Sequence, residues 1–347
     1  MKEYIVGENT AGQRFDKFLL KVLKGAPSSF IYKMLRKKNI VLNGKKADGS
    51  EKLNIDDTVK IFLSDETFLK FSGSNTETQN TENAEAKASK NSLDFDMSLE
   101  VSRILYEDKH ILLYDKPEGA LSQKAAEGDI SVNEQLIAYM LKTEQLEKEE
   151  LKTFKPSICN RLDRNTTGLL VCGKSLPGLQ EMNRLFHTRE IHKFYRCMIF
   201  GKLRKEGYLD GYLKKDERTN KVTFQKESFP GADPIRTGFA TVWTNGVISL
   251  LEIELITGKT HQIRSHLASL GTPIIGDSKY GNRQRNEEYK SKYGITSQML
   301  HSYRLEFPEL TAPFQYLGGQ KFIANMPPEY QMIMKDGKQE TDREAKR

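Results

Sequence analysis

One acidic side chain in the middle of the chain has an unusual setting. Asp163 lies between Arg161 and Arg164, and the apolar run 169–172, a predicted strand, follows it closely. An arbitrary Asp before a buried strand most often caps a turn. Here the neighbouring guanidinium groups favour the ionised carboxylate. An ionised carboxylate suits nucleophilic attack better than proton donation, so Asp163 is a candidate for chemistry.

The motifs of the commonest cofactor and metal sites are missing from the sequence. There is no GxGxxG after a strand, no GxxxxGK[ST], no HExxH and no GxSxG. Dinucleotide, nucleotide-triphosphate, zincin and serine-hydrolase chemistry therefore have no support. His261 and His266 are five residues apart, which does not align two imidazoles on one helix face. Because the three cysteines also include no CxxC pair, the sequence predicts no metal and no cofactor.

A cation that could pair with Asp163 comes from a predicted helix. The helix is expected to begin at a Thr260 cap and to end at Gly271. Its buried stripe would consist of Ile263, Leu267 and Leu270. Arg264 then lies beside this stripe, so its guanidinium can reach a neighbouring loop. On position alone, an ordinary surface arginine is equally expected.

Strands separated by turns dominate the C-terminal part of the chain. The runs 240–243 and 247–256 flank Asn245-Gly246, the strongest hairpin signal in the sequence. Tyr195 falls in another predicted strand, where an unplaced tyrosine is most often part of the core. Since few crossover helices separate the strands, we predict an α+β fold with a mixed, largely antiparallel sheet.

Composition divides the chain into four parts. Residues 72–92 contain no apolar side chain larger than alanine. Such a segment cannot bury enough surface to offset the entropy of ordering, so residues 72–97 are predicted to be a flexible linker. The linker separates a small N-terminal α/β domain, residues 1–71, from a large domain, residues 98–330. The polar residues 331–347 are predicted to be a disordered tail.

Charge points to a polyanionic partner. Lys and Arg number 54 against 47 Asp and Glu, a net charge of +7, which favours polyanions. No apolar run approaches 18 residues, and the chain start lacks a signal peptide's apolar core. We therefore expect a cytoplasmic protein without a membrane span, and a monomer.

The N-terminal domain concentrates positive charge on one helix and one turn. A helix is expected to start at Ser28, and a hairpin at Asn43-Gly44. Between residues 28 and 46 there are six basic side chains and no acidic one: Lys33, Arg36, Lys37, Lys38, Lys45 and Lys46. A charge run alone is as often a solvated helix face. Flexible linkage to a larger domain, however, raises the local concentration of a shared polyanion.

Five segments of the large domain occur in an order and spacing typical of one family. They read ILYEDKHILLYDKPEGALSQ, NRLDRNTTGLLVCGKS, HKFYRCMIFGK, LITGKTHQIRSHLASLGTPIIGDSKYG and LHSYRLEF. Together they resemble the RluA-type pseudouridine synthases, whose signature is usually written HRLDxxTSG. The resemblance runs from about Ser102 to Phe307. Asn160 stands where the signature has His and Thr167 where it usually has Ser, and both keep hydrogen-bonding capacity.

The resemblance implies a role for four residues. It makes Asp163 the catalytic carboxylate and Arg264 the cation paired with it. Tyr195 would pack against the target base, and Arg161 would enter the RNA stack where the target nucleotide leaves. Taking a uridine out of a helix costs a few kcal/mol of unstacking, which a wedge and an aromatic platform offset. His192, His261 and His266 are expected to be structural or to face RNA.

The N-terminal stretch from Arg14 to Phe62 resembles the S-four-type RNA-binding domain, in which two short helices and a turn present a basic surface. The implied function is isomerisation of a uridine in structured RNA, most readily large-subunit ribosomal RNA and second transfer RNA. The alternative is an inactive RNA-binding adaptor of the same fold. A nuclease is a weaker reading because no second carboxylate lies near Asp163 in the sequence to hold a metal.

Overall fold

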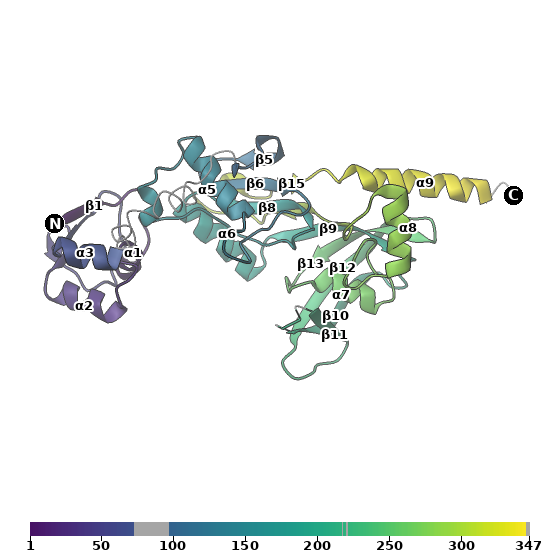
Figure 1. Cartoon of the computed structure of the whole chain (residues 1–347), viewed down its shortest axis with the longest axis horizontal. Helices are drawn as coiled ribbons and strands as arrows, with labels where there is room; N and C mark the ends of the chain where they lie inside the picture. Colours follow the sequence, from purple (N-terminus) through teal and green to yellow (C-terminus); the bar gives the residue numbers. More distant parts are fainter. Residues whose placement is uncertain (73–96, 217, 220, 345–347) are drawn as a thin grey trace, which may run out of the picture.

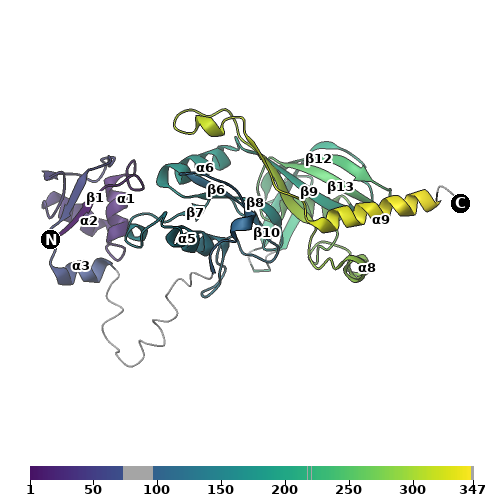
Figure 2. The same ribbon diagram turned by 90° about the horizontal axis from the view of Figure 1, so that it is seen from above.

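The computed structural model describes residues 1–72, 97–216, 218–219 and 221–344. Two separate sheets organise these residues. Figure 1 and Figure 2 both show the smaller sheet and its helices at one end of the molecule, and the last helix at the other. In the described part of the chain, no helix is both long and apolar enough to span a membrane.

The N-terminal residues form a four-stranded antiparallel sheet in the order β1-β4-β2-β3. Its strands are β1 (Lys2–Ile5), β2 (Ile40–Leu42), β3 (Lys45–Lys46) and β4 (Thr58–Ile61). The helices are α1 (Phe15–Val22), α2 (Ser28–Arg36) and α3 (Asp65–Ser72). The buried side chains of α1 and α2 recur at helical spacing and pack with the sheet into one apolar core.

The Asn43-Gly44 turn joins β2 to β3, where the sequence predicts a hairpin. Both residues have positive φ, 51° and 71°, as a two-residue hairpin of this kind requires. The predicted linker 72–97 lies, apart from its two ends, outside the described residues. At its start, Ser72 is the last residue of α3.

The larger sheet has eleven strands among the described residues, in the order β11-β10-β12-β13-β9-β14-β8-β6-β5, with β15 beside β14 and β7 beside β8. The first strands are β5 (Ile104–Glu107), β6 (Ile111–Lys116), β7 (Ser157–Ile158), β8 (Thr167–Gly173) and β9 (His192–Phe200). The others are β10 (Gly207–Asp216), β11 (Lys221–Gln225), β12 (Asp233–Thr244), β13 (Ile248–Leu255), β14 (Leu300–Glu306) and β15 (Lys321–Ile323). Among the strands that the structure describes, only β8 and β14 pair in parallel. The predicted α+β class with a mixed, largely antiparallel sheet is confirmed.

Two apolar cores lie on the two faces of this sheet, because successive strand residues point to opposite sides. On β8, Leu170 and Cys172 belong to one core, and Leu169 and Val171 to the other. Helices α5 (Val132–Lys142) and α7 (Gln262–Ser269) pack into the first core, and α6 (Leu176–Thr188) packs into the second. Helix α8 (Arg283–Tyr293) follows α7 along the chain. The loop that carries Asp163 therefore leads into a strand buried on both faces.

Two predictions about the ends of helices are wrong. Helix α7 does not begin at a Thr260 cap: its first residue is Gln262, and the residue before it, His261, has a left-handed φ of 52°. Leu270, predicted to be buried, lies beyond the helix end and is 38% exposed.

The predicted disordered tail is helical as far as the structure describes it. Helix α9 (Pro328–Glu344) covers most of residues 331–347. Its start is anchored, because Tyr330 and Ile333 are buried in the first core. The polar residues that follow continue a helix already nucleated by this packing.

Candidate active site

The loop that carries Asp163 is fixed by hydrogen bonds to its backbone. The Thr166 amide donates to the Asp163 carbonyl at 3.0 Å, and the Ser122 hydroxyl donates to the carbonyl of Leu162 at 2.9 Å. The ammonium of Lys116, fully buried at the end of β6, donates to the carbonyls of Pro117, Ala120 and Arg164 at 3.0, 2.8 and 2.8 Å. Burial lowers the pKa of Lys116 to about 8. Three donors thus meet three carbonyls and tie β6 to the loop.

Arg264 connects two carboxylates. Its Nη1 donates to Oδ2 of Asp163 at 3.0 Å. Its Nε and Nη2 donate to the two carboxylate oxygens of Asp277 at 2.7 and 3.0 Å, a bidentate pair. Burial alone would lower the pKa of Arg264, but the bonds to Asp277 and Asp163 outweigh it and raise that pKa. The arginine is a buried ionic link rather than a surface side chain, and the predicted pair with Asp163 forms.

Asp277 is placed by the loop between α7 and α8. Its side chain is 1% exposed, and its Oδ1 also accepts the amides of Lys279 and Tyr280 at 2.8 and 3.0 Å. Burial tends to raise the pKa of Asp277, but the bonds to Arg264 and these amides lower it overall. The carboxylate is therefore ionised and fully bonded, which fixes the guanidinium it holds.

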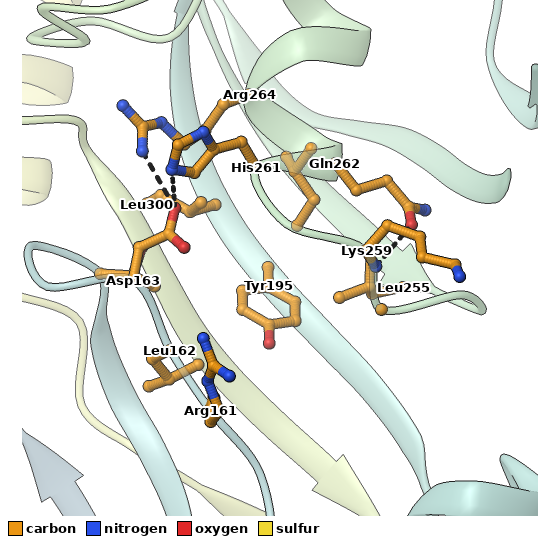
Figure 3. Close-up of a pocket in the computed structure, with 13 residues that line it drawn as sticks. Arg161, Leu162, Asp163, Tyr195, Leu255, Lys259, His261, Gln262, Arg264 and Leu300 are labelled. Atoms are coloured by element: carbon orange, nitrogen blue, oxygen red, sulfur yellow. Dashed lines mark hydrogen bonds and ion pairs between the residues drawn. The ribbon is translucent and has the colours of Figure 1, made fainter. Parts of the chain in front are cut away.

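His261 also faces the Asp163 oxygen that Arg264 bonds. Its Nε2 lies 3.9 Å from Oδ2 of Asp163, and its Nδ1 lies 2.9 Å from the hydroxyl of Tyr280. Burial lowers the pKa of His261, although the charge of Asp163 opposes this. Figure 3 shows Arg264 and His261 both directed at one carboxylate oxygen, with the other oxygen turned to the side where Tyr195 lies.

Tyr195 lines the same pocket from β9. The pocket has a volume of about 450 Å³ and is also lined by Asp163, Arg161, Leu255 and Leu300. Tyr195 is 6% exposed, and burial raises its pKa to about 12. Its ring therefore belongs to the hydrophobic core and also forms part of the pocket wall. Arg161 is exposed and makes no ion pair among the described residues.

A wider cleft continues from this pocket and is strongly basic. The described residues that line it include nine Lys and Arg side chains and a single acidic one, Asp163. The basic side chains are Lys124, Arg161, Arg164, Arg189, Lys193, Lys215, Lys259, Arg264 and Lys279. Such a concentration of one sign of charge attracts a polyanion and orients it along the cleft. We call this surface the basic cleft.

Asn160 and Thr167, the two departures from the family signature, both brace the Asp163 loop. Asn160 accepts the Val171 amide at 2.7 Å through its Oδ1. The Thr167 hydroxyl lies 2.8 Å from Nδ1 of His301 on β14. Both side chains therefore keep bonded positions that hold the loop against the sheet.

The six basic residues predicted to bind RNA in the N-terminal unit do not reach this pocket. All six are exposed, and none forms an ion pair with an acidic side chain in the described residues. They lie on α2, the turn after it, and β3: Lys33, Arg36, Lys37, Lys38, Lys45 and Lys46. They form a second basic surface, remote from Asp163.

Four contributors to the site had no assigned role at the sequence level. They are Lys116, His261, Asp277 and Tyr280. All four lie in segments that resemble the family, and this resemblance was the only feature of the sequence that pointed to them. Their partners in the site include residues 13 positions away, for Asp277 and Arg264, and 48 away, for Lys116 and Arg164, so no local pattern indicated what each would contact.

Comparisons with known proteins agree with this geometry. A family model described as RNA pseudouridylate synthase matches residues 110–269. An uncharacterized RNA pseudouridine synthase of Mycoplasma genitalium is 30% identical over 321 residues, 91% of this chain and 92% of the relative. The ribosomal large subunit pseudouridine synthase C of Buchnera aphidicola is 30% identical over 308 residues, 87% of this chain and 88% of the relative.

A solved structure shares the fold. Human RNA pseudouridylate synthase domain containing 4 superposes with a TM-score of 0.51 at 22% identity, covering 71% of this chain and 92% of the human chain. The motifs around Asp163, the family model and the full-length relatives all agree, and the chain belongs to the RluA-type RNA pseudouridine synthases, isomerases that act on RNA.

Proposed function

We propose that this enzyme converts a uridine of large-subunit ribosomal RNA to pseudouridine, with Asp163 as the catalytic carboxylate. The observation that carries the assignment is the setting of Asp163. It is the only acidic side chain among the described residues of the basic cleft, and Arg264 holds one of its two oxygens. The ribosomal substrate is supported by relatives named as ribosomal large subunit synthases.

The reaction exchanges one glycosidic bond for another. The bond between N1 of uracil and C1′ of ribose breaks, the freed uracil turns, and a bond forms between C5 and C1′. The proton on C5 leaves in the last step and N1, which the broken bond left without a substituent, takes up a proton, so atoms and charge balance without any change in oxidation state. Asp163 starts the sequence in one of two ways. It attacks C1′, and this bond breaks when C5 bonds to C1′, or it removes a proton beside C1′ and returns that proton when C5 bonds. Its Oδ1 has no hydrogen-bond partner among the described residues, which leaves this oxygen available for the reaction.

The target nucleotide has to leave its helix before Asp163 can reach it. Tyr195 offers an aromatic surface in the wall of the pocket, and Arg161 offers an exposed guanidinium at its mouth. We assign stacking on the uracil to Tyr195 and filling of the vacated space in the RNA to Arg161. The basic cleft supplies the cations for the neighbouring phosphates.

The N-terminal unit is proposed to be an S-four-type RNA-binding domain. Its six basic residues are all exposed and form no ion pair with an acidic side chain in the described chain. A second contact to the same RNA adds affinity because it raises the effective concentration of the RNA near the active site, without any new contact in the active site itself. The expected role is therefore in choosing and holding the RNA.

Replacing Asp163 by Asn tests the proposal. The substrate is unmodified large-subunit ribosomal RNA carrying tritium at C5 of uridine, because forming pseudouridine releases this tritium. D163N is expected to release none while binding the RNA as the wild type does. The control is D210N, at an exposed residue outside the pocket and cleft, which should keep full activity.

Three other outcomes have definite meanings. Binding without any tritium release by the wild type, on ribosomal or transfer RNA, would identify an adaptor instead of an enzyme. Release from transfer RNA alone would correct the substrate. Activity of D163N would remove the catalytic role of Asp163.

A further inference from the structure

The surroundings of the two Asp163 oxygens are unequal, because two side chains face one of them. Arg264 donates to Oδ2 from α7 at 3.0 Å. His261, the residue that precedes α7, places Nε2 at 3.9 Å from the same oxygen. That distance is too long for a hydrogen bond, but such contacts often shorten when substrate closes the site. The position of His261 is thus adjacent to the reacting group and lacks an assigned role.

Tyr280 determines which nitrogen of His261 carries the hydrogen. The Tyr280 hydroxyl accepts the amide of Val222 at 3.0 Å and lies 2.9 Å from Nδ1 of His261. Its own hydrogen then points to Nδ1 as acceptor, since this arrangement leaves no donor unused. In the neutral ring the hydrogen is therefore on Nε2, the atom that faces the negative Asp163.

We propose that His261 is a positioning residue of the reaction: Tyr280 holds its imidazole so that the Nε2 hydrogen faces Oδ2 of Asp163, beside Arg264, and keeps Oδ1 turned into the pocket. The inference rests on Asp163 being the catalytic carboxylate. It gives the two carboxylate oxygens different roles. Arg264 and His261 hold Oδ2, and Oδ1 takes part in the reaction.

The charges around His261 agree with a neutral donor. Burial lowers the pKa of His261; Asp163 and Asp277 act against this, while Arg264 and Lys279 act with it. A neutral imidazole orients the carboxylate by one hydrogen bond. A charged imidazolium would form a second ion pair and reduce the nucleophilic character of Asp163.

The anchor of His261 lies in a loop held from three sides. Asp277, three residues before Tyr280, bonds Arg264. The Asn286 side chain of α8 donates to the Asp277 carbonyl at 3.0 Å. Val222, on β11, donates to Tyr280. The 276–281 loop therefore sets both partners of Oδ2, Arg264 through Asp277 and His261 through Tyr280.

Three substitutions separate this role from a purely structural one. The amide nitrogen of Gln reaches roughly where Nε2 of His lies, whereas the amide of Asn reaches only as far as Nδ1. Residue 261 has a left-handed φ of 52°, which Asn adopts more readily than Gln or Ala. A structural role thus predicts that H261N is the mildest change, and the positioning role predicts that H261Q is.

The measurement is the single-turnover rate of tritium release from ribosomal RNA labelled at C5 of uridine, with RNA affinity and thermal unfolding measured in parallel. H261A and H261N are expected to be slower on the order of 10- to 100-fold, with unchanged affinity. H261Q should recover most of the rate. Y280F should give an intermediate loss that is absent in the H261A background, since both changes remove one interaction.

The outcomes distinguish this inference from the proposed function. If the wild type is active and D163N is not, the proposed function stands whatever His261 does. In that case H261N at least as active as H261Q, or Y280F and H261A at wild-type rates, would overturn the role of His261. An inactive wild type would overturn both.

Discussion

A single guanidinium serves two carboxylates at the centre of the site. Arg264 gives two hydrogen bonds to Asp277 and one to Asp163. The bidentate pair has a fixed planar geometry, while the single bond leaves Asp163 some freedom. Asp277 is also fully buried, whereas the Asp163 side chain is 28% exposed. The buried Asp277 therefore fixes Arg264, and Arg264 in turn orients the partly exposed Asp163.

Substitution of Asp277 by Asn is expected to reduce both stability and activity. The amide cannot neutralise the buried Arg264, which keeps only its pair with the partly exposed Asp163, and breaking a buried ion pair costs up to about 3 to 5 kcal/mol. Urea unfolding should show this loss, and the single-turnover rate should fall at least 10-fold because Arg264 is free to shift. D233N is the control: Asp233 pairs with Lys259 at 2.9 Å, but its side chain is 61% exposed, so little change is expected. A wild-type rate in D277N would contradict the account.

Sequence reasoning placed Asp163, Arg264 and Tyr195 in one site because each stands in a recognisable segment. It assigned nothing to Asp277, although Asp277 is only 13 positions after Arg264. The reason is that a helix end and a loop separate them, and their contact depends on how α7 packs. The meeting of Arg264 and His261 at one oxygen of Asp163 is likewise a product of tertiary structure.

At the level of elements, the start of β8 determines where Asp163 lies. β8 pairs in parallel with β14 at Thr167 and Gly168, directly after the Asp163 loop. Gly168 has a φ of 99°, and a Cβ added there would lie 2.2 Å from the carbonyl oxygen of Ser302. Both the backbone conformation and the close approach of β14 therefore require glycine.

The variant G168A is expected to destabilise the protein by at least about 2 kcal/mol, because both the φ angle and the backbone contact oppose a side chain. Chemical unfolding measures this directly. Gly258 is the matched control, since an added Cβ there meets nothing within 4 Å and φ is not positive. G258A should stay within about 0.5 kcal/mol of the wild type. Equal stability of the two variants would show that β14 moves away to accommodate the methyl group.

The sequence predicted element types better than element ends. The hairpin turns followed from Asn-Gly pairs, whose local backbone preference is strong. The start of α7 did not follow from a local signal, because His261 adopts a left-handed backbone conformation. This conformation accompanies the contacts of His261 with Tyr280 and Asp163. The helical continuation of α9 was missed for a similar reason: polar residues 335–344 give no apolar signal, and the anchor at Tyr330 and Ile333 lies before them.

For the whole molecule, the proposed function places two basic surfaces against one RNA. The basic cleft surrounds Asp163, and the N-terminal cations lie on a separate sheet and helix unit. Contacts to phosphates add affinity in proportion to the counterions that they release. The number of these contacts can therefore be obtained from how steeply RNA affinity falls with salt concentration.

Replacing Lys37 and Lys38 together by Gln should weaken RNA binding without changing the rate at saturating RNA. A plot of log affinity against log salt is expected to become shallower by about 2, roughly one per lost phosphate contact. The control replaces Lys335 and Lys338, two exposed lysines of α9, and should leave the slope unchanged. Identical slopes for both double variants would mean that Lys37 and Lys38 are merely solvated.

The sharing of Arg264 has a consequence for what enters the pocket. Two aspartates and one guanidinium leave the floor with one net negative charge, while eight other cations line the cleft around it. A phosphodiester is attracted to these cations but not to the two carboxylates, whereas uracil and ribose, which carry no charge, are indifferent to both. The electrostatic field thus sorts the parts of a nucleotide by depth before any specific contact is made.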